Sequence, residues 1–150
     1  MMTIAVDFDG TIVQHCFPEI GPPIGRSIEI LKRLKEEFRC AIILWTCREP
    51  GLGLEEAVEY CRSKGLEFAA VNESLPGSKL GKSKVLADLV IDDRGAGRIG
   101  GGFQPIGDMT PEEWDQIEKW IGARCWAKLE MYKRLEESGM MACSDPEAKN

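Results

Sequence analysis

Short apolar runs that end in polar side chains constrain the fold of this chain more than any other feature of its sequence. The runs, each with its polar residues, are 3–8 with Asp7 and Asp9, 40–45 with Thr46, and 86–91 with Asp92 and Asp93. Runs that are apolar along most of their length are typical of parallel strands covered on both faces. Because ligands bind outside the carboxyl ends of such strands, these polar residues predict a site at that edge of the sheet.

Helical patterns separate these runs. Apolar residues recur at helical spacing from Ile24 to Phe38 and again from Leu54 to Cys61, where Gly65 follows at the position of a left-handed C-cap. Further strands are expected at 67–71 and, in a short form, at 103–106. Strands that alternate with helices predict the α/β class, with a three-layer α/β/α, Rossmann-like parallel sheet.

The length of 150 residues suits one domain. We assign residues 1–138 to it, with a flap over about 12–24 and a C-terminal helical segment over about 110–138, and we expect 139–150 to be a flexible tail. The helical segment opens with a capping box of Thr110 and Glu113. One of its faces carries Trp114, Ile117, Ile121, Cys125 and Tyr132. Trp126 lies about 120° from Trp114, off this face; the helix either packs on two sides, which we favour, or contacts a second copy.

Composition excludes several classes of protein. Lys and Arg number 19 against 25 Asp and Glu, a net charge of −6, which disfavours nucleic acid as a partner. The six Cys form no CxxC pair, so neither a zinc site nor a disulfide framework is expected. Without a signal peptide or a membrane-length apolar window, we expect a cytoplasmic protein with no membrane contact.

The acidic residues at the strand ends predict a metal site. Asp7 and Asp9 lie two residues apart, Gly10 permits a sharp turn after them, and Asp92 and Asp93 end another strand. Four carboxylates that meet at one edge repel strongly unless a cation lies among them. Oxygen ligands select Mg²⁺, Ca²⁺ or Mn²⁺, and a site that also takes a phosphate favours Mg²⁺. The alternative is a set of exposed acidic loop ends without a metal.

Donors suited to a phosphate lie near the same edge. Thr46 offers a hydroxyl and a backbone N–H, and Cys47 and Arg48 follow it on the same turn. Lys84, eight residues before Asp92, can neutralise both a carboxylate and a phosphoryl oxygen. The candidate phosphate-binding residues are Gly10, Thr46, Cys47, Arg48 and Lys84, with Lys79 and Lys82 as rivals of Lys84.

Four of these segments together resemble a known family. The chain resembles, in this order, the four motifs of the haloacid dehalogenase-like (HAD) superfamily of phosphotransferases. DFDGTIV resembles the first motif, the Thr of LWTCR the second, Lys84 the third and the following ADLVIDDR the fourth. The resemblance implies strand order 5-4-1-2-3, with Asp7 as the nucleophile that forms an aspartyl-phosphate and Asp9 as general acid/base. Thr46 and Lys84 would then bind the phosphoryl group. Asp92, with or without Asp93, would bind Mg²⁺ beside Asp7, and the backbone carbonyl of Asp9 would be a further ligand.

The resemblance implies a capless phosphatase. Residues 12–24 and 66–83 leave no room for the cap domains of the family, so an open site would accept small or macromolecular phosphate monoesters. A second carboxylate at Asp9 favours a phosphatase over a dehalogenase. Alternatives are a catalytically idle binding module with this fold and a response-regulator-like phosphoacceptor, although in the latter the acidic pair precedes the acceptor Asp. A homo-oligomer through the C-terminal helix is a further expectation.

Overall fold

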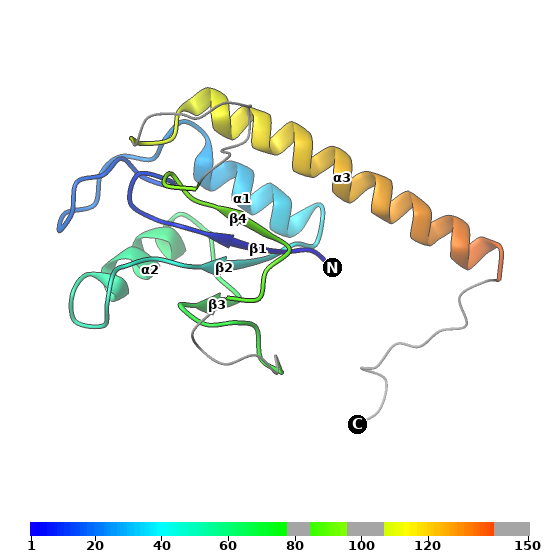
Figure 1. The fold of residues 1–150 in the computed structure, drawn as a ribbon, viewed down its shortest axis with the longest axis horizontal. Coiled ribbons are helices and arrows are strands. Elements are labelled where there is room, and N and C mark those ends of the chain that lie inside the picture. Colours follow the sequence, from blue (N-terminus) through cyan, green and yellow to red (C-terminus); the bar gives the residue numbers. More distant parts are fainter. Residues whose placement is uncertain (78–84, 96–106, 140–150) are drawn as a thin grey trace.

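The computed structural model describes residues 1–77, 85–95 and 107–139. Within them lie a four-stranded parallel sheet and three helices (Figure 1). The strands are β1 (Thr3–Val6), β2 (Ala41–Leu44), β3 (Ala70–Val71) and β4 (Leu89–Ile91), and the helices are α1 (Ser27–Glu36), α2 (Leu54–Ser63) and α3 (Pro111–Glu137). The α/β class and the parallel sheet of the sequence prediction are therefore confirmed.

The strand order is β3-β2-β1-β4, with every neighbouring pair parallel. Val6 at the end of β1 is in register with Leu44 on one side and Ile91 on the other, so three strands end at the same level. The order differs from the predicted 5-4-1-2-3, because the described residues contain no fifth strand beside β4. The predicted strand at 103–106 and the tail at 140–150 lie outside the described residues.

The three helices cover one face of the sheet, so in the described residues the fold has two layers of regular structure and not the predicted three. The core on that face joins β1 and β2 to the helices through residues that include Ile4, Val6, Leu31, Ile42, Leu44, Cys61 and Trp114. The crossovers from β1 to β2 and from β2 to β3 run in the same direction across the sheet, and right-handed crossovers then place both helices on the same side.

The other face of the sheet carries a small cluster. Ala5, Ile43 and Ala70 form it, and the loop residues that pack against it are Trp45, Leu75, Val85 and Ala87. Val90, which points to this face from β4, is 55% exposed. The connection from β3 to β4 has no helix in its described part, which is why the described residues lack the expected third layer.

Helix α3 packs along α1 and leaves the body of the protein at its far end (Figure 1). Its N-terminus has the predicted capping box: Thr110 accepts from the Glu113 N–H, and Glu113 accepts from the Thr110 N–H. Trp114 is fully buried and donates its indole N–H to the carbonyl of Thr11. Trp126, by contrast, is 61% exposed, so the prediction that the helix packs on two sides is wrong. No helix among the described residues combines the length and apolarity needed to cross a bilayer.

Candidate functional site

Three carboxylates meet at the carboxyl edge of the sheet. Asp7 follows β1, and Asp92 and Asp93 follow β4; one oxygen of each lies within 4.8 Å of the others. They converge because β1 and β4 are neighbours in register, and the Asp7 N–H extends the pairing by donating to the carbonyl of Ile91 at 3.0 Å. The donor set consists only of carboxylate oxygens, which fits a hard divalent cation such as Mg²⁺.

Thr11 connects the carboxylate of Asp7 to the backbone of Asp93, and the sequence prediction missed it. Its buried hydroxyl donates to Asp7 Oδ2 at 3.2 Å and accepts the backbone N–H of Asp93 at 3.0 Å. One side chain therefore ties the loop after β1 to the loop after β4. The signal was present in the sequence, because a hydroxyl residue directly after Gly10 stands next to the acidic pair.

Burial and mutual repulsion perturb the acidic group. Burial, together with the charges of Asp92 and Asp93, raises the pKa of Asp7 to about 7, although hydrogen bonds from the Phe8 backbone and Thr11 act in the opposite direction. Burial and the charge of Asp92 also raise the pKa of Asp93. A bound cation would lower the pKa of both carboxyl groups again, because its charge offsets the repulsion among the carboxylates.

We expect the raised pKa of Asp7 to make the metal-free protein less stable as the pH rises. Between the ordinary value of 3.8 and about 7, the folded state holds a proton on Asp7 that the unfolded state has lost. The free energy of unfolding therefore falls over this range. In EDTA, the free energy of unfolding of Asp7→Asn should exceed that of the wild type by about 1–2 kcal/mol at pH 8 and by clearly less at pH 5. Urea denaturation at the two pH values measures this, and an equal difference at both would contradict it.

Gly10 shapes the loop between Asp9 and Thr11. Its φ is +81°, and a Cβ there would lie 2.7 Å from Asp93 Oδ2 and 3.2 Å from Asp108 Oδ1. Its N–H donates to the carbonyl of Val13 at 2.7 Å. The prediction that Gly10 binds phosphate is therefore corrected, because its backbone donor is already used within the loop.

The carboxylate of Asp9 pairs with the guanidinium of Arg48 and lies outside the acidic group. The guanidinium contacts both carboxylate oxygens, with Nε to Oδ2 and Nη2 to Oδ1 at 2.8 Å each. The structure thus brings together three of the four carboxylates predicted to bind a metal, and it leaves out Asp9, whose side chain is engaged elsewhere. Such a bidentate pair is among the stronger hydrogen-bonded contacts in proteins.

Arg48 is a buried hub and not the predicted phosphate ligand. Beyond Asp9, its guanidinium donates to the carbonyls of Pro18, Glu19 and Gly53, so all five of its N–H groups are used. Its side chain is only 1% exposed, and it also lies about 5 Å from the rings of Phe8 and Phe17: 5.2 Å and 5.1 Å to the two centroids. Its contacts with Phe17, Pro18 and Glu19 tie the flap to the turn after β2.

The turn after β2 is held by Asn72, a second residue that the sequence prediction missed. Asn72 Oδ1 accepts the Thr46 N–H at 2.8 Å, and Nδ2 donates to the carbonyl of Arg48 at 3.2 Å. The Thr46 hydroxyl accepts the N–H of Arg48 at 3.2 Å. Asn72 directly follows β3, so the rule that polar residues end the strands applied to this strand as well.

The flap is a narrow loop whose two arms are joined. Gln14 donates to the carbonyl of Pro22 and Ile24 to the carbonyl of Ile12, each at 2.9 Å. At the tip, His15 is held by its N–H, which donates to Asp108 Oδ2 at 3.0 Å, and Phe17 is 52% exposed. The flap therefore forms one wall beside the acidic group.

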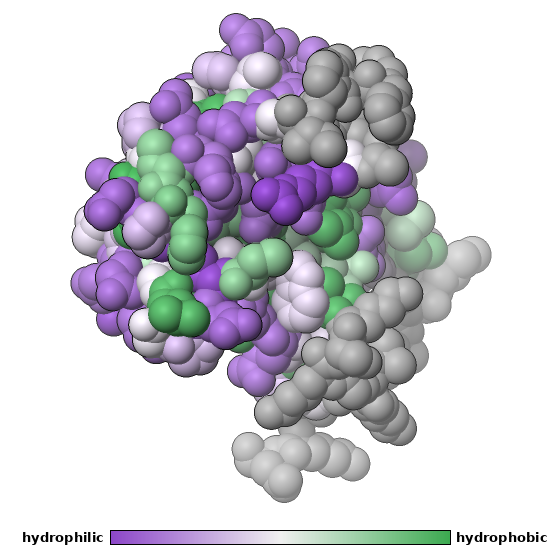
Figure 2. Space-filling view, turned by 60° about the vertical axis from the view of Figure 1, so that its left-hand side comes forward, coloured by the Kyte–Doolittle hydropathy of each residue, from purple (hydrophilic) through white to green (hydrophobic). Residues whose placement is uncertain are grey.

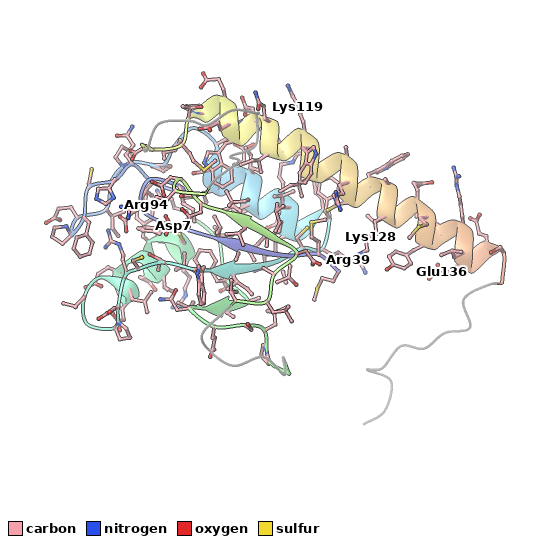
Figure 3. All side chains as sticks on the ribbon, in the orientation of Figure 1. Asp7, Arg39, Arg94, Lys119, Lys128 and Glu136 are labelled. Atoms are coloured by element: carbon pink, nitrogen blue, oxygen red, sulfur yellow. The ribbon has the colours of Figure 1, made fainter. Side chains whose placement is uncertain are left out.

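These elements enclose a cavity of about 290 Å³. It is lined by Asp7, Asp9, His15, Phe17, Thr46, Cys47, Arg48, Asp92, Asp93 and Arg94. Figure 2 looks onto this end of the molecule, which is largely hydrophilic with small apolar patches. Figure 3 labels Asp7 and Arg94, which lie close together at this end. The predicted residues Thr46 and Cys47 thus share one cavity with the acidic group. Lys79, Lys82 and Lys84 lie outside the described residues.

The fold and the site define a parallel α/β protein with an acidic group at the carboxyl edge of its sheet. Among solved structures, the chain is similar to a conserved protein of Bacteroides thetaiotaomicron: the identity is 43%, the match covers 82% of this chain and 91% of that one, and the TM-score is 0.65. The chain belongs to the family of this Bacteroides protein. No family model and no curated protein matches the sequence.

Proposed function

We propose that the protein is a Mg²⁺-dependent phosphohydrolase that cleaves phosphate monoesters through an aspartyl-phosphate on Asp7, as a capless relative of the HAD-like enzymes. The observation that carries the proposal is the position of Asp7. Its carboxylate lies at the strand end within 4.8 Å of the carboxylates of Asp92 and Asp93, and it faces a cavity that Thr46 also lines. The motif order in the sequence supports the same assignment.

The arrangement offsets the repulsion between a carboxylate nucleophile and a phosphate dianion. Asp7, Asp92 and Asp93 would hold the Mg²⁺, which supplies positive charge to the phosphoryl oxygens when bound. In the proposed reaction an oxygen of Asp7 bonds to phosphorus, while the bond from phosphorus to the leaving alcohol breaks. The hydroxyl of Thr46 and the ammonium of Lys84 would orient the phosphoryl group.

Asp9 is proposed to move the protons of both steps. Once it has left Arg48 and taken up a proton from solvent, Asp9 protonates the leaving alcohol oxygen. As the carboxylate it then takes a proton from the water that attacks the aspartyl-phosphate, which releases phosphate and restores Asp7. In the structure this carboxylate accepts two hydrogen bonds from the guanidinium of Arg48. The proposal therefore requires Asp9 to turn from the guanidinium towards the leaving oxygen once the substrate is bound.

The same Asp9–Arg48 pair favours a second candidate, a binding module that takes up a cation and a phosphate without turnover. In that case Asp9 would be a structural partner of Arg48, and the site would bind phosphate esters unchanged. The two candidates differ in one measurable respect, namely whether phosphate is released.

A metal-dependent phosphatase assay tests the proposal. With an aryl phosphate as substrate, we expect phosphate release that is lost in EDTA and restored by Mg²⁺. The Asp92→Asn/Asp93→Asn double variant should need at least about tenfold more Mg²⁺ for half-maximal activity, because two of three ligand charges are gone. Asp115→Asn, which changes an exposed carboxylate on α3, is the matched control. Undiminished turnover in EDTA would exclude the metal-dependent reaction.

A further inference from the structure

The distal half of α3 has no cover among the described residues. We call residues 126–137 the projecting segment. The residues of α3 that are buried end at Cys125, and none of the projecting segment is buried. Figure 1 shows this part of the helix extending past the sheet. Isolated helices of this length are marginal in water, because helices in proteins gain most of their stability from packing.

The buried face of α3 continues into the projecting segment. At helical spacing, the row that contains Ile121 and Cys125 runs on through Lys128, Tyr132 and Leu135. The flanks of this row are Leu129 and Glu136 on one side and Met131 on the other. Leu129 is 39% exposed, Tyr132 37% and Met131 51%. Figure 3 shows Lys128 and Glu136 on the side of α3 that faces the sheet, and Lys119 on the opposite side.

We infer that this row is the interface of a homodimer, in which the projecting segments of two copies pack antiparallel about a two-fold axis at Tyr132. This register places Lys128 of each copy opposite Glu136 of the other and Leu129 opposite Leu135, and it stacks the two Tyr132 rings. A parallel pairing in register would instead set Lys128 against Lys128 and Glu136 against Glu136. The row is thus self-complementary in charge and in apolar contact, as a two-fold interface requires.

The structure leaves room for the second helix. Beside the projecting segment lies a hollow of about 630 Å³ that opens between the helix, at Lys128 and Met131, and the edge of the sheet, at Met2 and Leu89. In the proposed register the C-terminal turn of the second helix ends where Cys125 is buried against Cys40 and Met2, and Met2 also lines this hollow. Since one pair of short helices is a small interface, we expect a weak and reversible dimer.

The dimer would leave both candidate sites open. Helix α3 begins beside the site, where the N–H of Met109 donates to the carbonyl of Gly10 at 2.7 Å, and it runs from there towards the opposite edge of the sheet (Figure 1). The second copy therefore does not act as a cap over the cavity. The inference is independent of the proposed function, because it uses none of the residues of the site.

Sedimentation velocity on the full chain, with charge-swap variants, tests the dimer. The wild type should pass from monomer to dimer at concentrations on the order of 10–100 μM, typical of a weak interface. Lys128→Glu and Glu136→Lys should each weaken self-association at least tenfold, because each sets like charges opposite one another. The double variant Lys128→Glu/Glu136→Lys should restore it, and so should mixing the two single variants. Lys119→Glu is the matched control on the opposite side of the helix.

Three outcomes would overturn the inference. The first is a wild type that stays monomeric over the whole concentration range, and the second is a dimer that neither single variant weakens. The third is a double variant, or a mixture, that stays as weak as the single variants. Far-UV circular dichroism checks that each variant is folded, and neither Lys128 nor Glu136 is buried, so this control distinguishes loss of association from loss of structure.

Discussion

Asp7→Asn is expected to abolish phosphate release, with kcat lowered by at least about a thousandfold. An amide is not a nucleophile towards phosphorus, so no aspartyl-phosphate can form, and the remaining groups can only bind the substrate. The measurement is turnover of an aryl phosphate at saturating Mg²⁺. Acid quenching of the wild type, followed by mass spectrometry, should in addition find a phosphoryl group on the peptide that contains Asp7.

The control for this variant is its own stability. Because the carboxylate of Asp7 is partly buried beside two other acids, Asp7→Asn should fold at least as well as the wild type. Loss of activity would therefore report chemistry and not unfolding. If Asp7→Asn kept full activity, the covalent mechanism would be wrong; if the wild type bound the ester and released no phosphate, the binding module would replace the enzyme.

Much of the fold was predictable because its signals are local. Each apolar run became a strand, although the ladders are shorter than the runs: β1 ends at Val6, and β4 begins only at Leu89. The capping box at Thr110 marked the start of α3, since cap residues act on the backbone next to them. The gathering of Asp7 with Asp92 and Asp93 followed from topology, because neighbouring parallel strands end at one edge.

The errors concern partners that are far apart in the sequence. Spacing placed Arg48 near the site, but it could not show that the five donors of Arg48 would be used by Asp9, by two carbonyls of the flap and by the carbonyl of Gly53. The periodicity of α3 could not show that Trp126 lies beyond the body of the protein. Likewise, the alternation of strands and helices predicted helices on both faces of the sheet. Which face of the sheet a helix covers depends instead on the direction of the crossover that contains it.

Arg48→Met is expected to be the most destabilising single change near the site, with a loss of about 3–5 kcal/mol in the free energy of unfolding. It leaves the partly buried carboxylate of Asp9 without its counter-charge and removes the donors to Pro18 and Glu19. Arg48→Lys should recover only part of the loss, because an ammonium cannot reproduce the planar fork. Urea denaturation followed by circular dichroism gives the values, and Arg62→Met, which breaks an exposed pair with Glu59, should change little.

The stability of this variant separates the two roles that Arg48 can have. A phosphate ligand contributes to substrate binding, so its loss would raise KM and leave the free energy of unfolding unchanged. A hub that ties the flap to Asp9 contributes to the fold, so its loss must lower stability even without substrate. Its coupling to Asp9 can be measured directly: Arg48→Met combined with Asp9→Asn should cost clearly less than the sum of the two single changes, because the double variant no longer leaves a buried charge unpaired. Additive losses would mean that Asp9 and Arg48 do not stabilise the fold through each other, whereas an unchanged free energy of unfolding in Arg48→Met would favour the phosphate-binding role.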